Sequence, residues 1–349
     1  MGAVGGLPWP GHDDGGRGPD ASSGVGDVKR ALVTGASGFV GPWLCHALLR
    51  DGWEVTGVSL TTLPGESVLS AHERAAIRWI QADLLAGSTI AQVVGESTPD
   101  AVFHLAGISF VPAFGDDPLA GFRTNVETTV SILAAVKQLR GASTLDPVVL
   151  VIGSAEQYGR HAPEHGRLTE NAACRPATWY AASKSAQEAM ALGAFRAEGL
   201  RVIATRSFNQ AGPGQSPRFL LPSLVERVRA LRDGAARDRK LVLGNLDTTR
   251  DFLHVSDAAA AYVALVDRGV PGEVYNVCSG DGVTVEALAR EVCARAGVDA
   301  VLTSDPALRR AVDVPWLVGD NSKLRSTTGW TPRRSRPDII DDLLNAASH

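Results

Sequence analysis

Tyr180 and Lys184 form a pair of residues whose types and spacing suggest chemistry. They stand four residues apart in the stretch WYAASKSAQEAM. The composition of this stretch favours a helix, so both side chains are expected on one helix face. A phenol has a pKa of about 10 and exchanges protons poorly near neutrality, but a neighbouring ammonium stabilises the phenolate. The pair could therefore serve as an acid or base; the alternative is a surface cation beside a half-buried ring.

A glycine-rich turn provides a second candidate site. Residues 34–41 read TGASGFVG, so that Gly35, Gly38 and Gly41 are spaced three apart between a β-rich run and a helical stretch. Glycines let the backbone approach a pyrophosphate, and the start of the helix supplies free N–H groups and a positive dipole. The turn predicts a dinucleotide-binding site; the alternative is a tight turn whose small residues serve packing alone.

The residues after the second predicted strand leave the choice between NAD and NADP open. An NAD site usually has an acidic residue about 20 positions beyond the glycines, where it binds the ribose hydroxyls. Here the strand ends in Ser59, Leu60 and Thr61, and no Asp, Glu or Arg follows directly. Asp83, after the third predicted strand, could bind the adenine amine or serve as a helix N-cap.

Strand and helix patterns alternate from residue 29 to about 206, and these elements must position the candidate residues. The strands are short and almost continuously apolar, and the longest helical stretches are 118–140 and 176–198. Strands of this kind are buried on both faces, as in a doubly wound parallel sheet. We therefore predict an α/β fold with a Rossmann-like dinucleotide-binding domain over residues 28–206. Residues 207–349 are predicted to form a smaller, mixed substrate region, with some elements returning to the first sheet.

Composition excludes several classes of function. The chain has 349 residues, a net charge of −4 and a pI of about 6.1, which argues against nucleic acid and anionic membranes as partners. Residues 1–27 are rich in Gly, Pro and Asp, lack the regions of a signal peptide and are expected to form a disordered leader. The four scattered cysteines indicate free thiols rather than disulfides or a metal site, so a cytoplasmic location is expected.

Taken together, several motifs resemble the extended short-chain dehydrogenase/reductase family over residues 29 to about 335. They are TGASGFVG, HLAG at 104–107, GSAEQYG at 153–159, YAASK at 180–184, RSFNQAGPGQ at 206–215, RDFLHVSDAAAAY at 250–262 and YNVCSG at 275–280. Within the family, FNQAGPGQ and RRAVDVPWLVGDNSKLRSTTGW look most like the GDP-4-keto-6-deoxymannose reductases and the related GDP-mannose 4,6-dehydratases.

The resemblance implies roles for individual residues. Tyr180 would be the acid or base, and Lys184 would lower its pKa and hold the nicotinamide ribose. Ser154 would hydrogen-bond the substrate oxygen, and Glu156 has the spacing of the base that dehydratases use. The residues expected to contact NAD(P)(H) are Gly35, Ser37, Gly38, Phe39, Val40, Gly41, Asp83, Leu84, Leu105, Ala106, Gly107, Tyr180 and Lys184. Those expected on the nucleotide-sugar side are Asn125, Asn209, Arg250 and Arg310, with Arg309 as an alternative to Arg310.

The resemblance leaves several reactions open. The C-terminal stretch AVDVPWLVGDNSKL favours NAD(P)H-dependent reduction of the C4 ketone of a GDP-4-keto-6-deoxyhexose. A GDP-mannose-type 4,6-dehydratase and a nucleotide-sugar 4-epimerase are the alternatives. A non-catalytic NAD(P)-binding sensor is less favoured, because such proteins usually lose the tyrosine or the lysine. In family dimers, the helices at 118–140 and 176–198 would pair across a two-fold axis, so a homodimer is expected.

Overall fold

A seven-stranded parallel sheet forms the centre of the molecule. The structure, a computed structural model, describes residues 28–62, 67–86, 88–109, 114, 116–161, 166–234, 239–309 and 312–346. The predicted leader, residues 1–27, lies outside the described residues. In spatial order, the strands are β3 (Arg78–Gln81), β2 (Glu54–Ser59), β1 (Arg30–Thr34), β4 (Ala101–His104), β5 (Val148–Ser154), β6 (Val202–Ser207) and β10 (Val274–Val277).

The strand order reverses beside β1, which pairs with β2 on one side and with β4 on the other. In open parallel sheets, ligands bind outside the carboxyl ends of the strands at such a reversal. The predicted doubly wound, Rossmann-like sheet is confirmed. β10 comes from the C-terminal part of the chain and extends the sheet beyond β6.

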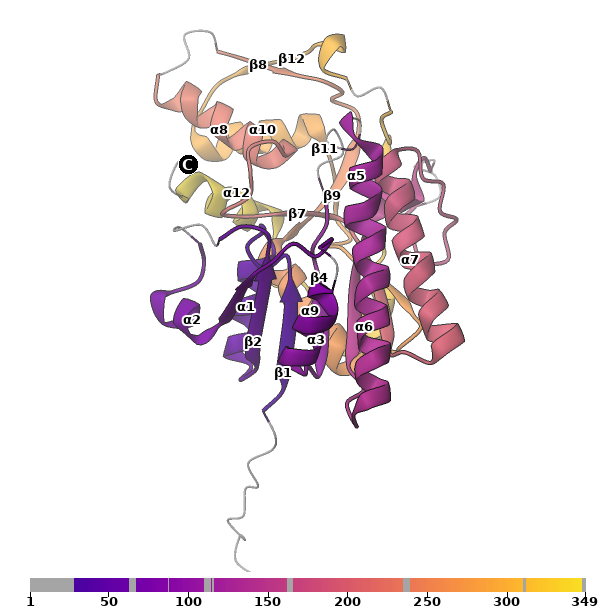
Figure 1. Cartoon of the computed structure of the whole chain (residues 1–349). Coiled ribbons are helices and arrows are strands. Elements are labelled where there is room, and N and C mark those ends of the chain that lie inside the picture. The colour runs from indigo at the N-terminus through magenta and orange to yellow at the C-terminus, as the bar shows by residue number, and fades with distance from the viewer. Residues whose placement is uncertain are drawn as a thin grey trace, which may run out of the picture.

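Helices cover both faces of the sheet, as Figure 1 shows. Successive strand residues point to opposite faces, so Ala31 and Val33 pack in one apolar cluster and Leu32 in the other. The first face is covered by α1 (Gly41–Arg50), α9 (Val255–Arg268) and α11 (Ser322–Thr328). The second face is covered by α3 (Thr89–Ser97), α6 (Thr128–Ala142) and α7 (Trp179–Glu198). The short helix α2 (Ala71–Ala76) connects β2 to β3, and α5 (Pro118–Phe122) precedes α6.

Above the carboxyl ends of the strands lies a second, smaller assembly with an apolar core of its own (Figure 1). Its helices are α8 (Leu220–Arg232), α10 (Val285–Ala296) and α12 (Arg336–Asn345). One small sheet contains β11 (Gly282–Thr284), β9 (Thr249–His254), β13 (Trp316–Leu317) and β7 (Asn209–Ala211), and the other pairs β8 (Lys240–Leu243) with β12 (Val301–Ser304). Single-turn 3-10 helices occur at Ala155–Tyr158 and Pro306–Leu308.

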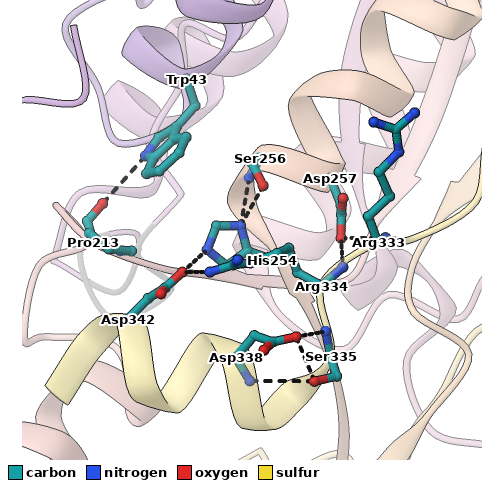
Figure 2. Close-up of polar contacts among 10 residues, drawn as sticks. All are labelled: Trp43, Pro213, His254, Ser256, Asp257, Arg333, Arg334, Ser335, Asp338 and Asp342. Atoms are coloured by element: carbon teal, nitrogen blue, oxygen red, sulfur yellow. Dashed lines mark hydrogen bonds and ion pairs between the residues drawn. The ribbon is translucent and has the colours of Figure 1, made fainter. Parts of the chain in front are cut away.

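Charged contacts connect the last helix, α12, to the rest of the molecule. Figure 2 shows Asp342 on α12 paired with Arg334, and its Oδ2 lies 3.2 Å from Nε2 of His254 at the end of β9. The His254 ring meets the edge of Trp43 on α1, and the Trp43 indole N–H donates to the carbonyl of Pro213. The helix that follows the glycine turn is thereby linked to α12 and to the loop after β7. In the described part of the chain, no helix is long and apolar enough to cross a membrane.

Candidate active site

A cavity of about 800 Å³ opens at the carboxyl ends of the parallel strands, between the two assemblies. All the residues predicted to bind the cofactor line it: Gly35, Ser37, Gly38, Phe39, Val40, Gly41, Asp83, Leu84, Leu105, Ala106, Gly107, Tyr180 and Lys184. Ser154, Glu156, Asn209 and Arg250 line it too, so one cavity brings together residues from both parts of the chain.

Each of the three positions in the turn requires a glycine for a different structural reason. Gly35 has φ +69°, and a Cβ there would lie 2.8 Å from the amide nitrogen of Ala106 at the end of β4. A Cβ on Gly41 would lie 2.3 Å from the carbonyl oxygen of Ala36, so this glycine allows the first turn of α1 to pack against the loop. Gly38 lines the cavity, which leaves the backbone there open to a ligand.

The start of α1 fits a pyrophosphate. The helix begins at Gly41 beside the cavity and has no acidic residue in its first turn. Among the described residues, no side chain caps this helix end, so its first N–H groups and its positive dipole are available to an anion. The residues present therefore fit the diphosphate of a dinucleotide.

Ser154 and Tyr180 meet at the cavity. Ser154 ends β5, and Tyr180 lies in the first turn of α7, where Thr178 caps the helix by accepting from the amide of Ala181. Burial raises the pKa of Tyr180 to about 12; a hydrogen bond with Ser154 opposes this rise, and the charge of Glu156 adds to it. Tyr180 is therefore a protonated phenol at neutral pH.

Lys184 lies one helical turn beyond Tyr180 but bonds elsewhere. Its Nζ donates to the carbonyl oxygen of Ile152 at 2.8 Å and to Oε1 of Gln187 at 2.9 Å. Burial lowers the pKa of Lys184 to about 8. The lowering of the tyrosine pKa by the lysine stays a prediction, since burial is the largest cause of the shift in the pKa of Tyr180 and Lys184 is not among its causes.

A buried polar network that the sequence analysis missed holds the Ser154 loop. The Ser154 amide donates to Oε1 of Gln157 at 2.9 Å, and Nε2 of Gln157 donates to Glu188 at 2.8 Å. Arg206 binds Glu188 through two N–H groups, at 2.7 and 2.9 Å. Ser154 and Gln157 form a capping box for the short helix after β5. The spacing Ser-x-x-Gln was visible in the sequence and could have revealed the Ser154–Gln157 pair.

Asn125 lies behind the site rather than in it. It is fully buried in a π-helical turn, Arg123–Glu127, where its Oδ1 accepts from the amide of Ile108 and its Nδ2 donates to Ser183. The place of Asn125 on the nucleotide-sugar side stays a prediction, and in this structure protein groups engage both ends of its amide. Asn125 joins the segment after β4 to α7, and a Cβ on Gly107 would lie 2.7 Å from its Oδ1.

The C-terminal part contributes charged and amide groups to the cavity. Arg250 donates to Asp313 at 3.1 Å, and Asn245 donates to the other oxygen of that carboxylate at 2.9 Å. Asn209 donates to the carbonyl of Asp251 at 3.2 Å. Arg310 lies outside the described residues, and Arg309 is exposed, with an N–H directed at Ser304. Asp313 and Asn245 line the cavity but were not predicted as site residues.

Three further cavity residues form a polar chain that was also missed. Gln210 donates to the hydroxyl of the fully buried Tyr262, and that hydroxyl is 2.8 Å from the hydroxyl of Ser207.

Asp83 lines the cavity, and its Oδ1 accepts from the amide of Leu85. Because α3 begins only at Thr89, Asp83 does not cap that helix. No group of His, Cys, Asp and Glu side chains suited to a metal occurs within the described residues.

Comparison with known proteins identifies the family. A family model described as GDP-mannose 4,6 dehydratase matches residues 32–343. The chain belongs to this family. It is therefore an extended short-chain dehydrogenase/reductase, whose relatives are nucleotide-sugar reductases, dehydratases and epimerases.

Individual relatives match this chain over almost its whole length. The GDP-6-deoxy-D-mannose reductase of Pseudomonas aeruginosa is 33% identical, over 91% of this chain and 97% of the relative. The structure of RMD from Pseudomonas aeruginosa complexed with NADPH matches with a TM-score of 0.74 and 30% identity, over 91% of this chain and 98% of that one. The UDP-glucose 4-epimerase of Thermus thermophilus in complex with NAD matches with a TM-score of 0.78 and 25% identity, over 91% and 100%. The family thus uses NAD(P) cofactors.

Proposed function

We propose that the protein reduces the C4 ketone of a GDP-4-keto-6-deoxyhexose with NAD(P)H. The observation that carries the proposal is the Ser154–Tyr180 pair beside Lys184 in the cavity, in a chain 33% identical to a GDP-6-deoxy-D-mannose reductase over nearly its full length. The bound nicotinamide cofactor would supply the hydride to C4.

In this proposal, Tyr180 gives its phenolic proton to the C4 oxygen as that oxygen gains negative charge. Tyr180 carries the proton that a donor needs at the working pH, since an ordinary phenol has a pKa of about 10 and burial raises the pKa of Tyr180 further. Ser154 donates a hydrogen bond to the same oxygen, which stabilises the developing charge. Gln157 fixes the backbone of Ser154, so this donor is already oriented before the substrate arrives.

The remaining predicted residues would hold the two ligands. The turn from Gly35 to Gly41 would bind the cofactor diphosphate, and Lys184 would donate to the nicotinamide ribose. Arg250 would bind the diphosphate of the nucleotide sugar, because a guanidinium matches phosphate oxygens in a fork and Asp313 already orients it. Asn209 would contact the sugar. Arg310 is proposed as a second diphosphate ligand from the sequence resemblance alone.

The second candidate is a 4,6-dehydratase, favoured by the position of Glu156. This carboxylate lines the cavity close enough to raise the pKa of Tyr180. A base there could remove the C5 proton of a 4-keto sugar and drive the loss of water from C5–C6. The two reactions differ in their substrate, since the dehydratase starts from GDP-mannose and needs no reduced cofactor.

The deciding experiment offers both substrates to the purified protein. With GDP-4-keto-6-deoxymannose and NADPH or NADH, we expect loss of absorbance at the reduced-nicotinamide band and a GDP-6-deoxyhexose as product. With GDP-mannose alone, we expect no keto sugar. If GDP-mannose gives a keto sugar with the wild-type protein but not with Glu156→Gln, the protein is a dehydratase and the proposed reductase function is wrong.

A homodimer in the cytoplasm is the proposed state of the protein. Large apolar side chains are exposed on α5, α6 and α7: Leu119, Phe122, Val130, Trp179 and Met190. α6 and α7 run side by side (Figure 1), so a second copy could cover this face with the same two helices. Light scattering should give twice the chain mass, and Trp179→Glu should shift it toward the monomer. Free thiols at all four cysteines suit a reducing compartment.

A further inference from the structure

A chain of buried hydrogen bonds runs from Lys184 into the interior, through side chains that the proposed mechanism does not use. Oε1 of Gln187 accepts from Nζ of Lys184 at 2.9 Å, and Nε2 of Gln187 donates to Oγ1 of Thr129 at 2.8 Å. Oγ1 of Thr129 lies 2.9 Å from Nε2 of His104, and Nδ1 of His104 lies 2.8 Å from Oγ1 of Thr34 at the end of β1. We refer to the buried residues Gln187, Thr129, His104 and Thr34 as the buried chain.

The neighbours of the buried chain fix the direction of its hydrogen bonds. A hydroxyl has one proton to donate, and Thr129 donates its proton to the carbonyl of Asn125 at 2.8 Å. Thr129 therefore accepts from His104, which must carry its proton on Nε2. At the other end, Oγ1 of Thr34 accepts from the amide of Ala106 at 3.2 Å, so its own proton is free for Nδ1 of His104. These donors all meet acceptors only if His104 is neutral.

A neutral His104 helps to fix the amide of Gln187. Burial lowers the pKa of His104 to about 3, and the charge of Lys184 adds to this fall, so the ring stays neutral near neutral pH. If the Gln187 amide were turned over, its NH₂ would face the Lys184 ammonium, and its oxygen would face Thr129, whose proton is already used. Both contacts would be repulsive. The oxygen of Gln187 is therefore held toward Lys184.

The ammonium of Lys184 depends on uncharged acceptors. It donates to the carbonyl of Ile152 and to Gln187, which leaves one of its three N–H groups for a ligand in the cavity that it lines. The titratable groups that face it are His104 on β4 and Tyr180 on α7, and both are uncharged at neutral pH. Within the described residues, burial alone lowers the pKa of Lys184, to about 8, and no carboxylate opposes this fall.

We propose that Gln187 is a positioning residue that keeps the Lys184 ammonium charged and directed into the cavity, and that Thr129 and His104 hold Gln187 in the orientation this requires. An amide oxygen at 2.9 Å stabilises an ammonium without neutralising it, whereas a carboxylate at the same place would form an ion pair with it. The effect on Lys184 itself does not depend on the substrate. Only the effect on turnover rests on the proposed function.

The first experiment measures Lys184 directly. The chain has five lysines, so carbon NMR of isotope-labelled lysine can follow the Lys184 signal through a pH titration of the full chain. Gln187→Met removes the acceptor and keeps the length of the side chain, so the pKa of Lys184 should fall by about one unit. Gln187→Glu adds a negative charge, so this pKa should rise by about one unit or more. An unchanged pKa of Lys184 in both variants would overturn the proposal.

A matched pair of variants at Thr129 tests the rest of the buried chain. Thr129→Ser keeps the hydroxyl and should leave the pKa of Lys184 close to that of the wild type. Thr129→Val has a similar shape but no acceptor for Gln187, so the pKa of Lys184 should fall as it does in Gln187→Met. Nitrogen NMR should show His104 as the Nε2–H tautomer, with no titration between about pH 5 and 8. Equal Lys184 pKa values in the two Thr129 variants, or a His104 that titrates in this range, would contradict the role given to the buried chain.

The pH dependence of turnover separates this inference from the proposed function. Turnover with NADPH should decline above about pH 8 as Lys184 loses its proton, and the decline should begin at lower pH in Gln187→Met and at higher pH in Gln187→Glu. If the pKa of Lys184 shifts while the pH dependence of turnover stays the same, Gln187 still positions Lys184, but the proposed contact of Lys184 with the cofactor is wrong. If the protein oxidises no reduced nicotinamide at all, the proposed function is wrong, and the NMR titration still decides the role of Gln187.

Discussion

The cavity has two sides. On the first, the part with the seven-stranded sheet, its residues follow neighbouring parallel strands. On the second, the C-terminal part with the two small sheets, they come from short strands and loops. Ser154 is held by Gln157 and Lys184 by a strand carbonyl, all within the first sheet and its helices. Arg250, by contrast, is held by Asp313, which lies 63 residues further along the chain. One part positions its groups by a continuous sheet, and the other by side-chain contacts between distant segments. The two parts should therefore respond differently to substitution, salt and pH.

The largest effect is expected from Tyr180→Phe in the first part. Loss of the phenolic proton should lower kcat by about 10²–10⁴-fold, because a positioned general acid contributes this much. The ring also packs against Phe114 and is buried, so the fold and the NADPH Kd should change little. Stopped-flow single turnover and fluorescence titration would measure the two quantities. Full activity in this variant would show that the protein is no Tyr-dependent reductase.

Asp251→Asn changes a fully buried carboxylate of the C-terminal part and tests how much it stabilises the fold. The Asp251 carboxylate accepts from the amides of Ser279, Gly280 and Gly319 and from the Ser279 hydroxyl, and it is fully buried. An amide NH₂ in place of one oxygen would face N–H donors, so the free energy of unfolding should fall by about 2–4 kcal/mol. Urea unfolding measures this loss. Asp313→Asn, which is partly exposed, should cost less than about 1 kcal/mol. Equal losses of unfolding free energy in Asp251→Asn and Asp313→Asn would contradict the expectation that burial makes the first carboxylate matter more.

Lys184→Met should separate stability from function in the first part. The folded-state pKa of about 8 lies below the ordinary value of 10.5, so burying the ammonium carries a penalty that is complete below about pH 8 and absent above 10.5. The variant should therefore lose activity, and its gain in the free energy of unfolding at pH 7 should stay below about 3 kcal/mol, because Met leaves the acceptors on Ile152 and Gln187 unpaired. The gain should shrink as the pH rises toward 10.5. A gain that is constant with pH would mean that packing, not charge, causes it.

The smallest effect is expected at the surface of the C-terminal part. Asp342→Asn removes the negative charge on α12 that pairs with Arg334 and lies beside the His254 ring (Figure 2). Because Asp342 and Arg334 are partly exposed, the loss in unfolding free energy should be about 0.5 kcal/mol and should fade in 1 M salt. Chemical unfolding at two salt concentrations measures it. A loss as large as that of Asp251→Asn would show that α12 is held by this contact rather than by its apolar face.

Sequence patterns predicted the elements of the first part well, because strand and helix patterns depend on near neighbours. The stretches around residues 118–140 and 176–198 are helical, and each apolar run contains a strand of the sheet. Pro222 lies in the first turn of α8, where its missing N–H would be unpaired in any case.

Contacts between distant residues were harder to predict. Glu188 is 31 residues from Gln157 and 18 from Arg206, and no local pattern pairs them. Likewise, no local pattern predicts that the amide of Asn125 donates in the interior to Ser183, 58 residues away. A local pattern cannot report burial of this kind, because burial depends on what packs above the residue.

By itself, the sequence determined the glycine spacing, the one-turn separation of Tyr180 and Lys184 and the order of the elements. Each of these depends on residues that are close together along the chain. Only the tertiary structure decided that burial raises the pKa of Tyr180, that Lys184 turns toward a strand carbonyl, and that Asp313 orients Arg250. The physical reason is that pKa values and ion pairs depend on solvent exclusion and on distances between groups that folding brings together.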